Sequence, residues 1–313
     1  MRQEFCQTKP VIGFWKTVDK KQENEYTITY GKFGGQNMRV KLVADSSANL
    51  NTMEDYDFAS AAMKIVTAEK EYVDTQALDV KEMLHDLQIY KGKSGTACPG
   101  VGEWTEAFDD ADMVLGVAIT SNLSGSYNSG RLAAEQYMEE HPDRKAFILD
   151  SLSTGPEMEL ILEKYGELVE KGLPFEDICE QIQKYHQSTH LYFSLESVSN
   201  LAKNGRVSPV VAAAVGLMGI RIVGKASASG TLETLHKCRG EKKAVKKIYA
   251  CMKEAGFAGG KVRIGHTYND EAVESLTALI RADFPDCDIR TRYNRGLCCF
   301  YAEEGGFLIG FEG

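Results

Sequence analysis

A run of hydroxyl and glycine residues between positions 119 and 131 has the composition of an anion-binding loop. Its sequence, ITSNLSGSYNSGR, follows an apolar segment, 113–119, that we expect to be a buried strand, and it precedes an expected helix. At such a turn, free backbone N–H groups and the helix dipole favour a negative charge. Ser124, Gly125 and Ser126 are therefore candidate ligands of an oxyanion. Capping of the helix by either serine explains the same residues without a ligand.

A second loop, 91–102, is rich in glycine and carries Thr96. A long loop of small polar residues requires an explanation in turn geometry or in ligand binding. The hydroxyls of Thr96, Ser124 and Ser126 have no evident histidine or aspartate base in the sequence, no nucleophile elbow and no phosphate-binding P-loop. The eight cysteines and six histidines are dispersed without zinc-ligand spacing. The sequence therefore predicts a binding site rather than a catalytic or metal site.

The bulk composition is that of an ordinary globular protein. The chain has 313 residues, which suffice for one large or two ordinary domains, with 43% hydrophobic and 26% charged residues. A formal net charge of −9 argues against a general nucleic-acid binder. No apolar run approaches the roughly 20 residues of a membrane span, and the first residues lack the apolar core of a signal peptide. We therefore expect a cytoplasmic protein.

The first half of the chain predicts an α/β domain over residues 39–155. Apolar strands alternate there with helices, which indicates a parallel, doubly wound sheet. We expect the main strands at 39–44, 113–119 and 146–149. A charged hairpin at 62–75 is expected to pack either within this domain or on the next one. The mixed polar segment 1–38 reads as an N-terminal extension.

The second half, 156–313, predicts a second α/β domain with a mixed or antiparallel sheet. The boundary is placed near Thr154, Gly155 and Pro156. Strand pairs joined by short turns support the antiparallel arrangement. The expected strands include 191–195, 221–226, 232–238, 262–266, 288–293 and 297–302. The small apolar segment 207–218 is equally consistent with the wall of a tunnel and with ordinary core packing.

Six segments, taken in their order and spacing, resemble the DegV family. The resemblance runs from about Met38 to the end of the chain. Each motif is weak alone, and the set is specific. The segments are VKLVADSSANL (40–50), KIVTAEKEYVD (64–74), GTACPG (95–100), ITSNLSGSYNSG (119–130), FILDSLSTG (147–155) and NLAKNGRVSP (200–209).

This resemblance implies the two-domain DegV-like fold, with a ligand in the cleft between an N-terminal parallel sheet and a C-terminal mixed sheet. Members of this bacterial family resemble the fatty-acid-binding subunits of fatty acid kinases. It implies a bound fatty acid such as palmitate or oleate, with the acyl tail in an apolar tunnel. The carboxylate is then held by the hydroxyls of Thr96, Ser124 and Ser126 and by the N–H of Gly125. A separate kinase subunit phosphorylates this carboxylate, so the binding protein itself is not an enzyme.

Two further residues are auxiliary candidates. Arg206, just after a glycine, is expected either to contact a partner or an anionic group, or to be a solvated arginine near a helix end. His266 ends an expected strand. It is expected either to help hold the carboxylate or to lie beside a helix cap formed by Asn269 or Asp270.

The sequence departs from the family pattern at the proposed carboxylate grip. The family has a C-terminal histidine where this chain has Ala302, followed by two acids. The first family loop has hydroxyls where this chain has Ala97 and Gly100. These changes are consistent with a different ligand, with weak fatty acid binding, or with a lost site. A small-molecule enzyme that uses the hydroxyl loop is the alternative from another functional class.

Overall fold

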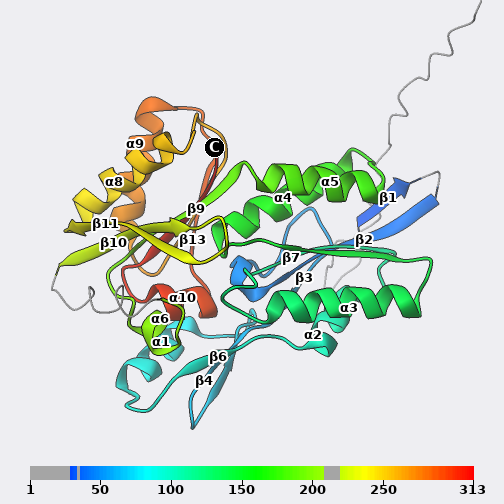
Figure 1. Ribbon diagram of the computed structural model, residues 1–313, viewed down its shortest axis with the longest axis horizontal. Helices are drawn as coiled ribbons and strands as arrows, with labels where there is room; N and C mark the ends of the chain where they lie inside the picture. Colours follow the sequence, from blue (N-terminus) through cyan, green and yellow to red (C-terminus); the bar gives the residue numbers. More distant parts are fainter. Residues whose placement is uncertain (1–28, 34–35, 208–218) are drawn as a thin grey trace, which may run out of the picture.

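The computed structural model describes residues 29–33, 36–207 and 219–313 of the chain (Figure 1). Most of the predicted extension 1–38 lies outside these ranges. The predicted apolar segment 207–218 lies outside them as well, apart from Val207. Within the described part of the chain, no helix combines the length and apolarity that a membrane crossing requires.

The first sheet is built around one long strand, β2. Strands β7 and β3 pair with β2 in parallel, β8 pairs in parallel with β7, and β1 adds an antiparallel partner along the first residues of β2. The mainly parallel sheet predicted for this half is therefore confirmed. Its strands are β1 (Thr29–Phe33), β2 (Gln36–Asp45), β3 (Phe58–Ala61), β7 (Met113–Ala118) and β8 (Lys145–Asp150).

Helices cover both faces of this sheet, as Figure 1 shows. They are α2 (Val101–Phe108) and α3 (Ser126–Glu140) on one face, and α4 (Pro156–Glu170) and α5 (Phe175–His186) on the other. Successive side chains of a strand point to opposite faces. Leu42 accordingly packs with residues of α4 and α5, whereas its neighbour Val43 packs with residues of α2 and α3. Burial on both faces explains the continuous apolar strands of the sequence.

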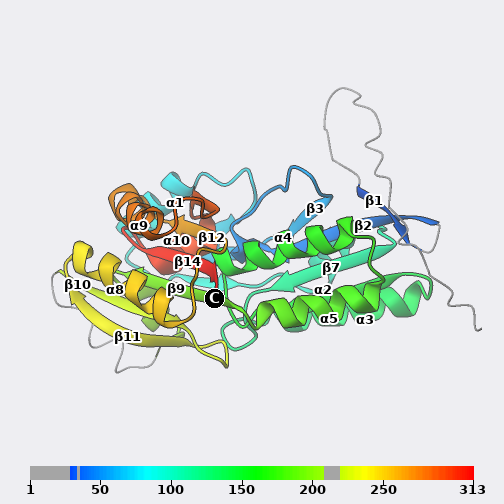
Figure 2. The same cartoon turned by 90° about the horizontal axis from the view of Figure 1, so that it is seen from above.

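Helix α4 contacts both halves of the molecule. Leu162 and Tyr165 lie in the core of the first sheet, and the helix also packs against strands β12 and β14 of the second sheet. Figure 2 shows α4 running from the second sheet along the first. The boundary predicted near Gly155 would place α4 and α5 in the second domain. In packing terms these helices complete the first sheet, so that boundary stays a prediction.

The second sheet has six strands in the order β11-β10-β9-β14-β12-β13. Its pairs are antiparallel except for β12 and β13, which confirms the predicted mixed sheet. The strands are β9 (Thr189–Leu195), β10 (Ile220–Ala226), β11 (Leu232–Arg239), β12 (Val262–His266), β13 (Ile289–Tyr293) and β14 (Phe307–Glu312). Helices α8 (Glu241–Glu254) and α9 (Asp270–Asp283) cover one face. The other face presents Leu191, Phe193 and Leu308 toward α10 (Gly296–Ala302) and α6 (Ser199–Lys203).

A small third sheet, β5-β4-β6, lies beside α10 and α1 (Val80–Ile89). Strands β4 (Lys64–Val66) and β5 (Glu71–Val73) form the predicted hairpin, and β4 packs against α10. The third strand, β6 (Gly95–Ala97), lies in the segment expected to be a loop.

The predicted strand at 297–302 is wrong, because this segment forms helix α10. A distant carboxylate caps its first turn. Asp74, which follows β5, accepts hydrogen bonds of 2.9 Å from the backbone N–H groups of Gly296 and Leu297. Such a cap satisfies the N–H groups that a helix start leaves free. The helix brings Leu297, Cys298, Tyr301 and Ala302 to the wall of a cavity, whereas an extended strand would present alternate residues.

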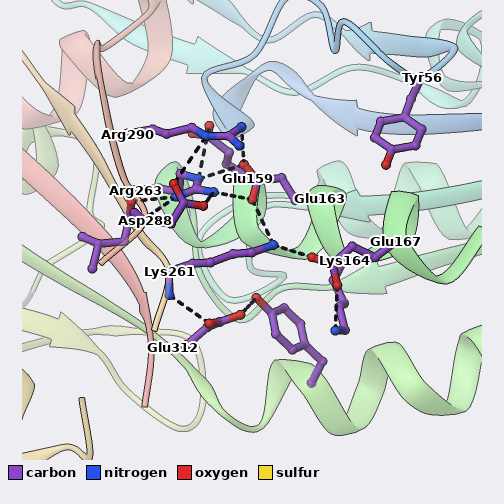
Figure 3. A network of polar contacts seen from close by, with 12 residues as sticks. Tyr56, Glu159, Glu163, Lys164, Glu167, Lys261, Arg263, Asp288, Arg290 and Glu312 are labelled. Atoms are coloured by element: carbon purple, nitrogen blue, oxygen red, sulfur yellow. Dashed lines mark hydrogen bonds and ion pairs between the residues drawn. The ribbon is translucent and has the colours of Figure 1, made fainter. Parts of the chain in front are cut away.

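A network of charged residues joins α4 to the second sheet (Figure 3). Its centre is Arg263 on β12, whose side chain is fully buried. The guanidinium is 2.7 Å from Glu163 Oε2 of α4 and 2.8 Å from Asp288 Oδ2. Lys261 forms a further ion pair with Glu167, one helical turn along α4. The network thus fixes the edge of the second sheet to the helix that packs on the first.

Candidate ligand-binding site

A cavity of about 330 Å³ lies where the two large sheets, the small sheet, α6 and α10 meet. This volume is within the range of roughly 300–1,000 Å³ that is typical of small-molecule sites. Aliphatic and aromatic side chains of the second sheet, of α6 and α10, and of the segments that follow β3 and β7 form most of the wall. The lining residues are Met63, Thr96, Ala97, Cys98, Ile119, Leu123, Ser124, Gly125, Thr154, Leu191, Phe193, Leu195, Leu201, Arg206, Leu232, Leu297, Cys298, Tyr301, Ala302 and Leu308.

Polar side chains from four separate segments meet in this apolar cavity. Thr96 Oγ1 lies 2.8 Å from the hydroxyl of Tyr301. Arg206 Nε donates a 3.3 Å hydrogen bond to the carbonyl of Leu123, the residue before Ser124. The structure therefore brings together the predicted residues Thr96, Ser124 and Arg206 and adds Tyr301, which the sequence did not indicate.

Ser124 lines the cavity and also supports the start of α3. Its hydroxyl accepts a 3.3 Å hydrogen bond from the backbone N–H of Ser126, and its own N–H donates to the carbonyl of Thr120. A hydroxyl has one O–H donor besides its acceptor lone pairs. Capping and ligand binding are therefore compatible roles for Ser124.

Gly125 lies at the wall of the cavity, next to Cys98. A Cβ built on Gly125 would lie 3.3 Å from the Cys98 sulfur, whereas the backbone of Gly125 is right-handed helical, with φ −75°. The glycine is therefore not required by backbone strain. It leaves the backbone at this point of the wall uncovered by a side chain, as close approach to a ligand requires.

Ser126 does not line the cavity, because it faces a buried carboxylate. It is fully buried, and its hydroxyl donates a 2.7 Å hydrogen bond to Asp45 Oδ2. The same oxygen accepts the N–H of Ile119 at 2.9 Å, and the other oxygen of Asp45 accepts the N–H and the hydroxyl of Ser47. Burial raises the pKa of Asp45, and these hydrogen bonds oppose that shift. Through Asp45, Ser126 thus anchors the loop between β7 and α3 (residues 119–125, the serine loop) on the side away from the cavity.

Asp45 supports the wall of the cavity through Ile119 and Ser126, a role that sequence reasoning missed. The available signal was its position at the end of β2, next to β7 in a parallel sheet. The carboxyl ends of parallel strands meet at one edge, which places Asp45 beside the loop that follows Ala118.

The Asp45→Asn variant is expected to lose about 1–3 kcal/mol of unfolding free energy. Both carboxylate oxygens of Asp45 accept backbone N–H groups, so the asparagine NH2 must face either Ile119 or Ser47, donor against donor. Urea unfolding measures the loss. Asp110→Asn, an exposed acid in a turn, is the control and is expected to stay within about 0.5 kcal/mol. Equal losses in the two variants would contradict this role of Asp45.

The auxiliary candidate His266 lies outside the cavity. It is buried at the end of β12, and its Nδ1 accepts the N–H of Asn269 at 3.2 Å. The side chain of Asn269 caps α9. Burial lowers the pKa of His266, and the charge of Asp270 opposes that shift. The placement of His266 matches the helix-cap alternative, so we leave this residue out of the proposed site.

Ala302 lines the cavity and offers no side-chain donor there. Of the two acids that follow it, Glu303 accepts the backbone N–H of Asn200 at 2.9 Å, and Glu304 is exposed. Neither is among the cavity residues. The departure from the family pattern therefore removes a donor from the wall without adding a negative charge to it.

The cavity has no evident catalytic apparatus in the described part of the chain. Its described wall contains no histidine, aspartate or glutamate. Over residues 29–33, 36–207 and 219–313, no group of three or more His, Cys, Asp or Glu side chains is placed to hold a metal ion. What the described wall offers is hydroxyl donors, one guanidinium and a large apolar surface, which suits an amphiphile with one anionic end.

Comparison with known proteins gives a consistent result. A family model described as "Uncharacterised protein, DegV family" matches residues 39–312. A DegV domain-containing protein of Streptococcus pneumoniae is 41% identical over 279 residues, which cover 88% of this chain and 99% of that protein. A DegV family protein from Eubacterium eligens, loaded with heptadecanoic acid, has 42% identity and a TM-score of 0.85, over 87% of this chain and 99% of that one. The Streptococcus pneumoniae Fatty Acid Kinase (Fak) B3 protein, loaded with linoleic acid, has 41% identity and a TM-score of 0.86, over 88% and 99%. The chain therefore belongs to the DegV family.

Proposed function

We propose that this protein binds a long-chain fatty acid in the cavity and presents the carboxylate to a partner kinase, without catalysing a step itself. One observation carries the proposal. An apolar cavity contains a cluster of hydroxyls and the guanidinium of Arg206, which has no carboxylate partner among the described residues. A carboxylate buried among apolar side chains needs such donors, because its desolvation is otherwise too costly.

The kinase partner rests on the related proteins. The Fatty Acid Kinase (Fak) B3 protein of Streptococcus pneumoniae, at 41% identity, carries the kinase in its name. The described residues offer no candidate metal site for a phosphate donor, and the described wall of the cavity has no carboxylate or histidine that could act as a base. Both findings are consistent with chemistry supplied by another subunit.

We propose the cytoplasm as the site of action, because the described cysteines are free thiols, as expected in a reducing compartment.

Lipid extraction and native mass spectrometry of the purified protein test the proposal. We expect a co-purifying acyl chain, or a mass increase of one fatty acid after incubation with palmitate or oleate. Incubation with the matching long-chain alkane, which lacks the carboxylate, is the control for non-specific uptake. A protein that carries no acyl chain and takes up neither acid would contradict fatty acid binding.

The Ser124→Ala variant is expected to weaken fatty acid binding by roughly tenfold to a hundredfold, because a hydrogen bond to a charged group contributes about 1.5–3 kcal/mol. Displacement of a fluorescent fatty acid measures the affinity. Ser121→Ala is the matched control, since Ser121 lies in the same loop, is exposed, and does not line the cavity. Equal affinities for Ser124→Ala and Ser121→Ala would remove Ser124 from the site.

A further inference from the structure

We propose that Tyr301 is a direct ligand of the fatty acid carboxylate. Its hydroxyl donates a hydrogen bond to one carboxylate oxygen. This inference rests on the proposed function and adds a residue that the loop motifs do not indicate. Tyr301 lies on α10, directly before Ala302, and its side chain is half-buried at the cavity wall.

The pairing of two hydroxyls leaves one donor free. Thr96 and Tyr301 are 2.8 Å apart, and either hydroxyl can be the donor of this bond. The two groups carry two protons, and their mutual bond uses one of them. Among the described residues, neither hydroxyl has another hydrogen-bond partner. One O–H therefore remains available in a cavity whose wall is otherwise largely apolar, and a carboxylate is the acceptor that gains most from it.

The cavity that Tyr301 lines also contains a positive charge, that of Arg206. Burial raises the pKa of Tyr301, while the hydrogen bond with Thr96 and the positive charge of Arg206 oppose the shift. The two groups thus supply a neutral donor and a positive charge to the same cavity.

The position of Tyr301 is fixed from two sides. Its ring packs edge-on against Phe300, with ring centroids 4.9 Å apart. The first turn of α10 is capped by Asp74, which sets the rotation of the helix and hence the side chains that face the cavity. A donor on such a short, capped helix is preorganised, so little conformational freedom is lost when the ligand binds.

The test compares a fatty acid with its methyl ester on matched variants. Binding of oleic acid and of methyl oleate is measured by displacement of a fluorescent probe from wild type, Tyr301→Phe and Tyr293→Phe. Tyr293 is an exposed tyrosine of β13 outside the cavity and serves as the control. We expect Tyr301→Phe to weaken oleic acid binding by roughly tenfold or more, with a much smaller effect on the ester, because a hydrogen bond to a carboxylate is stronger than one to a neutral carbonyl.

The outcomes separate this inference from the proposed function. If wild type binds oleic acid and Tyr301→Phe binds it equally well, Tyr301 is not a ligand, whereas the proposed function stands. If Tyr301→Phe loses acid and ester to the same extent, its hydroxyl serves only packing and the inference is overturned. If wild type binds neither compound, both fall. Thr96→Val provides a second test. If the two hydroxyls act as a pair, the loss of oleic acid affinity in the double variant Thr96→Val/Tyr301→Phe differs from the sum of the losses in the two single variants.

Discussion

The Arg263→Met variant is expected to lose about 3–5 kcal/mol of unfolding free energy, because it removes the fully buried partner of the largely buried Glu163. Arg263 Nε and Nη2 bind both oxygens of Glu163, at 2.8 and 2.7 Å, and Nη2 also binds Asp288. The Glu163 side chain is only 13% exposed. Methionine fills most of the space but neutralises neither acid. Denaturant unfolding followed by circular dichroism measures the loss.

A neighbouring arginine provides the control for this prediction. Arg290 contacts the same carboxylate of Glu163 at 3.2 Å, but 59% of its side chain is exposed. Arg290→Met is therefore expected to cost no more than about 1 kcal/mol. Removal of both charges in Arg263→Met/Glu163→Leu should recover part of the stability of the single variant. Similar losses for the two arginines would show that burial of the charge does not determine the effect.

The Ala302→Phe variant is expected to weaken fatty acid binding by roughly fivefold to a hundredfold while the protein stays folded. Ala302 is buried and its methyl group faces the cavity, so a phenyl ring occupies the space that the acyl chain needs. An overpacked apolar site loses about 1–3 kcal/mol, which corresponds to roughly fivefold to a hundredfold in affinity. Isothermal titration with oleate measures the change.

Thermal unfolding separates a blocked cavity from a damaged fold. In the free protein the new ring packs into empty space, so the melting temperature of Ala302→Phe should not fall as far as the binding does. Ala282→Phe, at an exposed position of α9, should leave both quantities unchanged. Wild-type affinity in Ala302→Phe would place the ligand elsewhere.

The two sheets and the serine loop were predictable from local patterns. The apolar run 113–118 predicts a buried parallel strand, and the hydroxyl-rich turn after it lies at the sheet edge where α/β proteins bind ligands. The comparisons confirm the family that these motifs indicated. The assignments of Thr96 and Ser124 to a carboxylate remain predictions, which the variants above test.

The features that escaped prediction depend on contacts between distant segments. The apolar run 297–302 was expected to be a strand, since a short apolar run does not distinguish strand from buried helix. The contact that starts α10 comes from Asp74, 222 positions away. Tyr301 could not be assigned to the cavity without that helix. His266 is a candidate by residue type alone. Its hydrogen bond with the N–H of Asn269 places it beside the cap of α9, outside the cavity.

The position of α4 constrains how a ligand enters and leaves. This helix packs on the first sheet and is bound to the second through Arg263, so a hinge movement that parts the sheets would have to break a buried ion cluster. Such an opening is energetically expensive. If the cavity binds a fatty acid as proposed, we expect the acid to enter and leave through local movement of small elements of the wall, such as β6 and α6. On this view the small elements of the wall move when a ligand exchanges, and the two large sheets keep their relative position.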